Sequence, residues 1–480
     1  MRGCVNMRRK TLLILAVCFC LSGCTLAPKH TRPEAPVPSS WSSGPAYKET
    51  ETGPSAPAAD ELKWEEFFTD ERLKKIIGMA LNNNRDLRLA ALNVERARAF
   101  YGIQRAELLP TLDVVGSGSK ERVPADLSET RERMTRERYS VDLGILSWEI
   151  DFFGRIRSLK DRALEEYLAT KQARRSVQIS LLSAVANAYL TLAADRETLK
   201  LAQSTLETQE AVYKLINRRY NIGLASALDL RRAQTQVDTA RGDIARYTQL
   251  VAQEENALNL LAGSPVPSEL LPTNLGGVSP PKEVSPGMTS DVLLSRPDIM
   301  SAEHQLKAAH AFIGAARAAF FPRISLMTAV GTASQELSGL FKSGSGTWSF
   351  TPQVVMPIFD ARTWAALKVS KTDREIVLAQ YEKAIQTAFR EVADALAQRG
   401  TVGDQIAAQE SLVQASAETY RLSNARYTKG IDSYLSVLDA QRSLYAAQQG
   451  LIAIRLARLN NLVTLYKVLG GGDRANGRSQ

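Results

Sequence analysis

The sequence predicts a mixed fold, in which a membrane β-barrel is continued by a long α-helical coiled-coil barrel, with four strands from each chain and twelve in a trimer. Three observations lead to this prediction. The 480-residue chain contains an internal duplication, and each copy holds two segments with strand-like alternation. Each copy also holds a helical run far longer than a globular core needs.

The duplication is visible in the order and spacing of Pro, Gly and Arg-Tyr landmarks. Asp86–Pro110 aligns without gaps with Asp298–Pro322, at a shift of 212 residues. Further on, Arg219–Gly223 matches Arg426–Gly430 at a shift of 207 residues. Ala-rich helices can resemble one another by chance, but chance does not preserve the order and spacing of these Pro, Gly and Arg-Tyr landmarks. The chain therefore contains two copies of one supersecondary unit.

Strand-like alternation occurs twice in each copy. It is clearest at Thr347–Ile358 and at Tyr139–Ile145, fainter at Ile324–Val330 and weakest at Thr111–Val115. A period of two residues gives one apolar and one polar face. A strand over a soluble core shows the same pattern, so the alternation alone does not identify a membrane strand.

The helical runs are the second element of each copy. Arg155–Tyr220 contains neither proline nor glycine, and at 1.5 Å per residue it would span roughly 100 Å. Ala361–Tyr427 repeats the arrangement, with Gly400 and Gly403 as the expected soft points. Apolar residues recur at heptad-like offsets, which favours packing as coiled coils; examples are Leu181, Val185, Ala188 and Leu192.

Barrel closure sets the expected number of chains. A sheet edge cannot remain open in lipid, because its backbone groups would lack hydrogen-bond partners. Four strands cannot close, and about eight leave no open bore, so three chains with twelve strands are the smallest pore. Trp148 and Trp348 stand near strand ends, as in the aromatic girdles of outer-membrane barrels.

The N-terminus predicts export and a lipid anchor. Arg8, Arg9 and Lys10 precede the apolar stretch Thr11–Leu21, which is too short to span a bilayer and has the length of a signal h-region. The segment ends in Leu-Ser-Gly-Cys at Cys24, which resembles the bacterial lipobox. We therefore expect cleavage before Cys24, acylation of its thiol and, by resemblance to bacterial lipoproteins, sorting to the outer membrane. The Pro-rich stretch that follows should be an extended tether or wrap.

Composition argues against several other classes of function. The formal charge of +9 includes four basic residues in the first ten, and past Gly23 only 56 basic residues face 51 acidic ones. This is no electrostatic footprint for nucleic acid. His304 and His310 share a helix at a spacing that does not make a ligand pair, and His30 lies in the tether. We expect no enzyme activity, no metal site and no cofactor. The alternating charges of Arg131–Arg138 predict a solvated loop.

Together these residues resemble the outer-membrane factor (TolC-like) family, and within it the OprM-like lipoproteins of tripartite efflux pumps. The most specific segments are Trp148–Arg155, Ser295–Ile299, Gly314–Pro322 and the two Arg-Tyr turns. The resemblance implies a homotrimer in the outer membrane with a large periplasmic extension. It also implies two partners: a periplasmic adaptor (membrane fusion) protein and an inner-membrane transporter of the resistance-nodulation-division type.

The resemblance also implies a periplasmic gate at the helical turns of Gly223 and Gly430, which would face the adaptor. In the family, side chains repeated three times around the axis close the pore; the matching positions are Leu435, Asp439, Asp432, Tyr427 and Asp229. Three aspartates that approach one another would favour a cation. A packing role for Tyr427 and a solvated helix face for Asp439 stay open.

The expected segments follow from these boundaries. They are the signal peptide (1–23), lipid anchor and tether (24–60), first-repeat helices (61–110), first β-hairpin (111–153), first long helical hairpin (154–263), linker (264–288), second-repeat helix (289–322), second β-hairpin (323–359), second long helical hairpin (360–470) and tail (471–480). The function expected is passive conduction of exported small molecules. The alternatives are a type I secretion duct for a polypeptide and a periplasmic coiled-coil adaptor lipoprotein without a pore.

Overall fold

The computed structural model describes residues 25–48, 57, 59, 62–285 and 289–471, so Cys24 lies outside the described residues. The chain divides into two units, and each unit draws on both copies of the repeat. Among the described residues, the first unit comprises the chain up to Pro33, Asn93–Thr170 and Ser301–Tyr381. The second comprises Glu34–Leu92, Lys171–Met300 and the chain from Glu382 onward.

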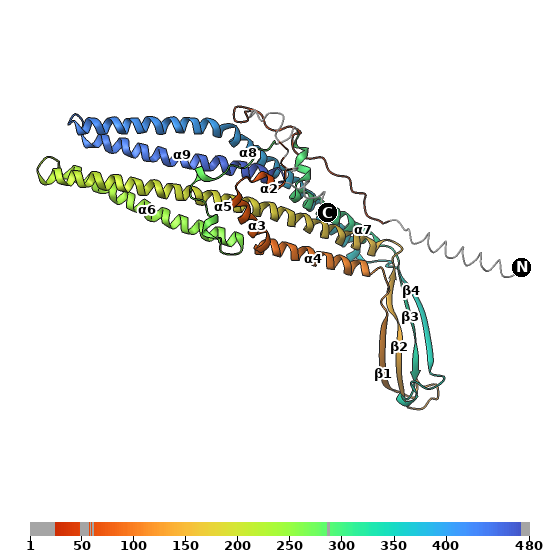
Figure 1. The fold of residues 1–480 in the computed structure, drawn as a ribbon. Coiled ribbons are helices and arrows are strands. Elements are labelled where there is room, and N and C mark those ends of the chain that lie inside the picture. Colours follow the sequence, from red (N-terminus) through yellow and green to blue (C-terminus); the bar gives the residue numbers. More distant parts are fainter. Residues whose placement is uncertain (1–24, 49–56, 58, 60–61, 286–288, 472–480) are drawn as a thin grey trace. The chain divides into compact units, whose positions relative to one another are not determined.

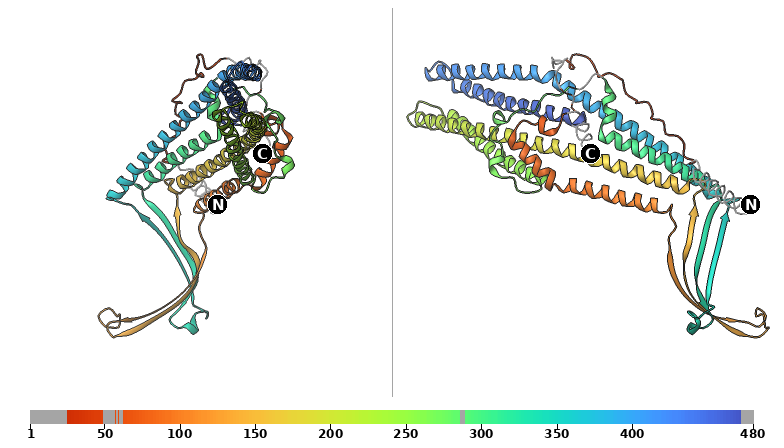
Figure 2. Two further views of the ribbon diagram at one scale, coloured as in Figure 1. Left: turned by 90° about the vertical axis from the view of Figure 1, so that its left-hand side faces the viewer. Right: turned by 45° about the vertical axis from the view of Figure 1, so that its right-hand side comes forward.

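The first unit contains one antiparallel sheet of four strands in the order β1-β2-β3-β4 (Figure 1). Its strands are β1 (Asp113–Val123), β2 (Met134–Ile150), β3 (Arg323–Ser334) and β4 (Gly346–Val355). Each copy of the repeat supplies one hairpin, and β2 joins the hairpins by pairing with β3. The sheet bends along its length (Figure 2). Among the described residues, its outer edges, β1 and β4, have no further strand beside them.

All four predicted strands are present, with different ends. β1 runs on to Val123, far beyond the weak alternation at its start, and β4 ends at Val355, before Pro357. The prediction of a solvated loop at Arg131–Arg138 was wrong in its second half, because β2 begins at Met134. There the charges alternate across a strand, and Glu137 forms an ion pair with Lys120 of β1.

Two helices of the first unit pack against each other. α7 (Pro297–Ala318) lies along the start of α5 (Arg155–Asn221), where Ser301 Oγ donates to Ala169 O at 2.9 Å and His304 contacts Glu165 at 2.6 Å. α4 (Arg85–Ala106) is the first-repeat counterpart of α7, and both have 22 residues. Both helices end four residues before the proline that was expected to stop them.

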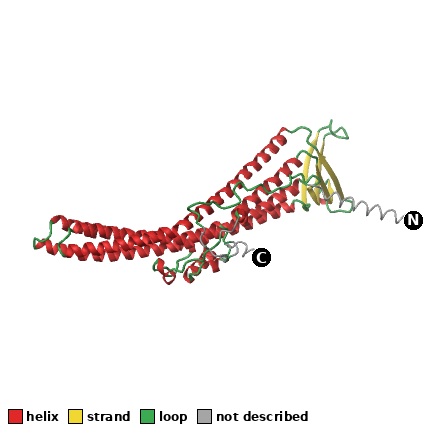
Figure 3. Cartoon of the chain, turned by 90° about the horizontal axis from the view of Figure 1, so that it is seen from above, coloured by secondary structure: helices red, strands yellow, loops and turns green. Residues whose placement is uncertain are grey.

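The second unit is helical (Figure 3). Besides most of α5 and of α8 (Ala361–Thr428), it contains the hairpin partners α6 and α9. The remaining bounds are α2 (Trp64–Phe67), α3 (Glu71–Asn83), α6 (Ala227–Ala262), α9 (Tyr434–Val468) and the 3-10 turns η1 (Ser268–Leu270), η2 (Leu275–Gly277) and η3 (Ser290–Ser295); η4 (Leu337–Gly339) belongs to the first unit.

The long helices confirm the prediction from the Pro- and Gly-free runs. α5 has 67 residues and α8 has 68. Leu181, Val185 and Leu192 of the heptad-like series are buried. Aromatic packing adds to this core, since the ring of Tyr466 on α9 stacks on Phe67 of α2 with 4.0 Å between centroids.

Residues 25–48 contain no helix or strand and form an extended strap, as expected from their proline content. In the second unit, Trp41 stacks on Phe389 of α8 with 5.6 Å between centroids. Gly400 is no soft point, because α8 continues through it and a Cβ there would collide with the backbone of Ala46. The glycine therefore lets the strap approach the helix closely.

Candidate functional site

The two helical turns of the second unit share one backbone motif. Gly223 and Gly430 have φ of +75° and +74°, and each donates its N–H to the tyrosine three residues earlier at 2.9 Å. The next residue closes a wider loop, from Leu224 N to Arg219 O at 2.7 Å in the first turn and from Ile431 N to Arg426 O at 2.9 Å in the second. This is the Schellman ending of a helix, in which only glycine adopts the left-handed conformation without strain.

Side chains make the two turns different. Arg426 binds Asp432 at two points, with Nε–Oδ2 at 2.6 Å and Nη2–Oδ1 at 3.0 Å. The guanidinium holds the pKa of the Asp432 carboxyl below its usual range through these hydrogen bonds. The first repeat has Ala225 at the position of Asp432, so Arg219 has no such partner in its own turn.

Arg219 instead joins the two hairpins. Its Cζ lies 5.4 Å from the ring centroid of Tyr427, within the range of a cation–π contact. Tyr427 also lies 5.5 Å from the ring of Tyr434. Tyr427 therefore makes the packing contact between helices that was one of its two predicted roles, and its role in the gate stays a prediction.

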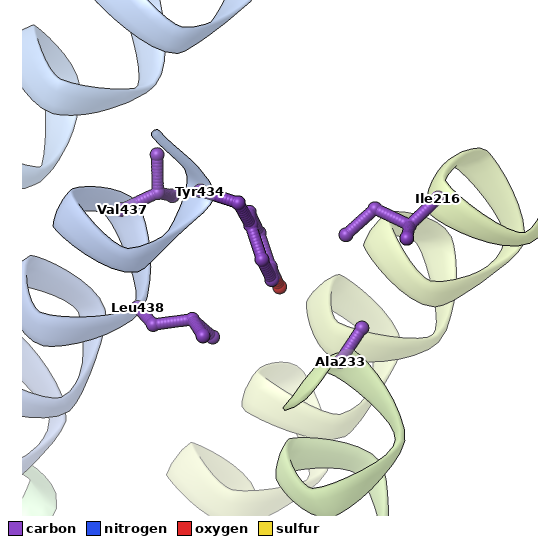
Figure 4. Close-up of a cluster of buried hydrophobic side chains, with 5 residues drawn as sticks. All are labelled: Ile216, Ala233, Tyr434, Val437 and Leu438. Atoms are coloured by element: carbon purple, nitrogen blue, oxygen red, sulfur yellow. The ribbon is translucent and has the colours of Figure 1, made fainter. Parts of the chain in front are cut away.

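A buried cluster lies next to these contacts. Tyr434 of α9 points toward the first hairpin, where Ile216 of α5 and Ala233 of α6 receive it, and Val437 and Leu438 complete the cluster (Figure 4). Tyr434 is 3% exposed, and burial raises the pKa of its hydroxyl. That hydroxyl has no hydrogen-bond partner among the described residues.

Apart from Tyr427, the predicted gate residues divide into two groups. Asp432 and Asp229 are used within their own turns, since Asp229 accepts a hydrogen bond from Ser226 Oγ at 2.7 Å and its N–H donates to the same oxygen at 3.1 Å. Leu435 and Asp439 do not belong to the cluster and are exposed, Leu435 by 42%. They stand four residues apart and so share one face of α9.

Sequence reasoning missed Arg219, Arg426 and Tyr434. The repeated Arg-Tyr pair was a visible signal for the two arginines, but it was used only to align the copies. No repeated motif marks Tyr434 in the sequence, because its burial depends on how α9 packs against the first hairpin.

Farther along the helices, α6 and α9 are joined by polar contacts. Arg442 donates to Gln236 Oε1 at 3.2 Å, and the Tyr445 hydroxyl to Asp243 at 3.1 Å. A cavity of about 360 Å³ lies between α5, α6 and α9, lined by Gln209, Gln441 and neighbouring polar residues. The side-chain oxygens of both glutamines are buried without a partner among the described residues. The two hairpins therefore meet through an apolar cluster near the turns and a polar interface beyond it.

Known proteins resemble this chain over almost its whole length. The family model described as outer membrane efflux protein matches residues 76–264 and 288–471. The chain is 50% identical over 465 residues to the toluene efflux pump outer membrane protein TtgC of Pseudomonas putida, with 96% of each chain covered. It is 42% identical over 462 residues to the outer membrane protein OprJ of Pseudomonas aeruginosa, with 95% of each covered.

Solved structures show the same fold. The open state of the MtrE outer membrane channel of Neisseria gonorrhoeae matches with a TM-score of 0.83 and 38% identity, over 94% of this chain and 99% of that one. A membrane protein from Pseudomonas aeruginosa matches with a TM-score of 0.87 and 42% identity, over 94% of this chain and 98% of that one.

Proposed function

We propose, from the premise that this chain belongs to the outer membrane efflux protein family, that three copies of it form the exit duct of a tripartite efflux pump. The chain is an outer-membrane efflux protein, and the proposal concerns how it is assembled and what it conducts. The observation that carries the proposal is the four-stranded sheet, whose two edges are unpaired within the described part of the chain. Such edges are not stable in lipid, and edge pairing among three copies would give a closed barrel of twelve strands.

The register of the sheet supports closure. Asp113, the first residue of β1, lies in the same row as Gly144, Ala329 and Ser349. Ser349 is six residues from Val355, the end of β4 from which the chain continues to α8. A stagger of this kind tilts the strands, and tilt is what a closed barrel requires.

The duplication supplies a template for the contact between copies. Within one chain, α7 of the second repeat packs on α5 of the first, through Ser301 against Ala169 and His304 against Glu165. In the same contact, Arg162 lies over the ring of Phe312, at 4.5 Å. If the repeats alternate around a ring, the next contact joins α4 of one copy to α8 of its neighbour.

Subtracting 212 from the residue numbers on α7 and adding 207 to those on α5 gives the expected pairs. Phe312 becomes Phe100 and Arg162 becomes Val369, which are 58% and 56% exposed in the single chain. Ser301 becomes Leu89 and Ala169 becomes Ile376, which are also exposed. Each named contact inside the chain includes a polar or charged side chain, whereas its counterparts are exposed apolar residues whose burial is favourable by about 25 cal/mol per Å². These faces therefore suit a second copy of the chain.

Disulfide cross-linking tests this arrangement in the full-length protein in membranes. The pair Phe100→Cys with Val369→Cys should give covalent dimers and trimers on oxidation. The matched pair Arg162→Cys with Phe312→Cys should close a bridge within one chain and leave its mass unchanged. If the control pair forms its bridge within one chain but the pair Phe100→Cys with Val369→Cys forms no bridge between chains, this trimer is ruled out.

At the periplasmic end, we assign the constriction to Leu435 and Asp439. Their exposed face on α9 has no covering among the described residues, and three copies would form a leucine ring and an aspartate ring. Asp432, Tyr427 and Asp229 would set the shape of the turns and the link between hairpins. The glycine turns would meet the adaptor, and Cys24 would carry lipid.

Small molecules are the proposed cargo. The relatives at 48–50% identity are named for toluene, solvent or antibiotic efflux, which favours this cargo over a secreted polypeptide. A resistance-nodulation-division transporter and a periplasmic adaptor would deliver it. Conduction through such a duct is passive and requires no catalytic residue.

A further inference from the structure

The N-terminal strap of the first unit is seated on α7 by a small set of contacts. Gly314 leaves the room that the strap needs, because a Cβ there would lie 2.8 Å from Ala27 N and 2.9 Å from Ala27 Cα. Arg317 Nη1 donates to Leu26 O at 3.0 Å. The corresponding glycine of the first repeat, Gly102, has no atom within 4 Å of such a Cβ. The seat therefore belongs to the second repeat.

Two histidines meet at the centre of this seat. His30 of the strap and His310 of α7 are 5.3 Å apart between ring centroids, with the rings nearly perpendicular. Both nitrogens of His30 and Nδ1 of His310 are buried and make no hydrogen bond with the described residues. A neutral imidazole in this setting already has polar nitrogens without partners among the described residues, and uptake of a proton makes it an unsolvated cation, which is far more costly to bury.

Charges of both signs surround the pair, but each acid near His30 is already bound by a basic side chain. Glu303 of α7 is the nearest acid to His30, at 3.8 Å, but it is already bound by Arg32 of the strap at 2.5 Å and by Lys307 at 2.9 Å. Glu165 of α5 also acts on His30, although His304 holds it at 2.6 Å. On the other side, Arg374 of α8 acts on His310. A proton added to either ring would thus meet burial and repulsion with no free carboxylate beside it.

We propose that His30 and His310 form a proton-sensitive clasp, which holds the strap on α7 near neutral pH and releases it in acid. Metal binding is a poor alternative, because no group of three or more ligating side chains is arranged for a metal within the described part of the chain. The clasp is independent of how copies assemble, so it can fail while the channel proposal stands.

The direction of the pH dependence follows from linkage. Burial, with a contribution from nearby cations, lowers the pKa of His30 and His310 below the ordinary value of 6.5. A group that binds protons more weakly when docked than when free favours the docked strap at high pH. Docking therefore weakens as the pH falls below about 6.5, and each unit of pKa difference is worth about tenfold in the docking equilibrium.

A spin label on the strap measures this release in the full-length protein in lipid nanodiscs. Lys29 is exposed, so a nitroxide attached after Lys29→Cys reports strap mobility without occupying the seat. Between pH 7.5 and 5.0 the ratio of mobile to immobile label should rise, by at most about thirtyfold for each histidine that has the ordinary pKa of 6.5 when free and stays neutral while docked. An unchanged spectrum over this range would overturn the proposal.

Three further variants separate the clasp from general acid effects. His30→Gln combined with His310→Gln should abolish the pH dependence, and His304→Gln is the matched control, which should keep it. If the double variant releases the strap at every pH, the single variant His310→Phe decides, because phenylalanine keeps the edge contact but cannot take up a proton. Its titration should be clearly shallower than that of the unaltered chain; an identical titration would remove His310 from the clasp.

Discussion

The guanidinium of Arg219 lies over the ring of Tyr427, 5.4 Å from its centroid, and so connects the first helical hairpin to the second. The equivalent arginine of the second repeat, Arg426, is held by Asp432 inside its own turn. Arg219 and Arg426 thus occupy equivalent positions in the two repeats. They have different partners because only the second repeat has an acid, Asp432, within the turn. One shapes a turn, and the other joins two hairpins.

Removing the contact between hairpins should loosen the periplasmic end. Arg219→Ala eliminates a cation–π interaction worth about 0.5–1 kcal/mol at an exposed site, once in each copy. We expect higher single-channel conductance in planar bilayers and more frequent openings. Arg218→Ala is the control, because it removes the same charge from an exposed neighbour. Equal effects of both changes would mean that net charge, and not the contact with Tyr427, controls the current.

The two glycines within α8 should respond in opposite ways to alanine. Gly400→Ala places a methyl group against the strap backbone at Ala46 and should detach the strap there. Gly403 has nothing within 4 Å of such a methyl group, so Gly403→Ala should stabilise the helix by up to about 1 kcal/mol. Protease cleavage of the strap and thermal unfolding measure the two effects. Strap cleavage that is as slow in Gly400→Ala as in the unaltered chain would contradict the close approach.

Tyr434 offers a test of the buried cluster. Tyr434→Ala leaves a cavity between the hairpins and should cost about 3–5 kcal/mol, as for other large aromatic residues. Tyr434→Phe keeps the ring and removes a buried hydroxyl that has no partner among the described residues. It should leave the melting temperature unchanged or raise it. A clear loss of stability in Tyr434→Phe would show that the hydroxyl is bound in the assembled protein.

Much of the fold could be predicted because its signals are local. The absence of proline and glycine from residue 155 to residue 220 leaves a helix no place to stop, and α5 runs through the whole stretch. The alternation of apolar and polar residues located the strands, but it predicted their ends poorly. β1 continues through small and charged residues up to Val123, since pairing with β2 supports residues that have little strand preference of their own.

Contacts between distant segments could not be predicted. His30 and His310 stand 280 positions apart, and their spacing in the sequence says nothing about the seat at Gly314 that brings them together. The same holds for Arg219 and Tyr427. The repeat identified equivalent positions, but only packing showed that equivalent arginines have different partners.

The proposed constriction gives the sharpest test of the channel. Leu435 and Asp439 lie on one exposed face of α9, and neither packs in the cluster of Tyr434, Val437 and Leu438. A leucine ring closes a pore by apolar contact and by expelling water, whereas an aspartate ring admits cations and repels anions. The two residues should therefore control different properties of the current.

Leu435→Ala should widen the constriction, raise the conductance and make cells admit large antibiotics that the outer membrane normally excludes. Asp439→Ala should chiefly weaken the preference for cations and the inhibition by divalent ions, with a smaller change in conductance. Ser436→Ala is the control, since Ser436 is exposed on the same turn but carries neither bulk nor charge. Planar-bilayer recordings of the intact protein under a salt gradient give both conductance and ion preference.

The competing explanation is that both residues pack against a neighbouring copy away from the pore. A buried leucine truncated to alanine would then cost about 2–5 kcal/mol, so Leu435→Ala would dissociate the assembly at lower temperature without raising its current. Native gels after heating detect that loss, and recordings on the assembly that survives separate it from opening. Because Leu435 is already 42% exposed within its own chain, any large loss of stability must come from a contact between copies. Unchanged current in both variants would remove Leu435 and Asp439 from the constriction and return the search to the turns themselves.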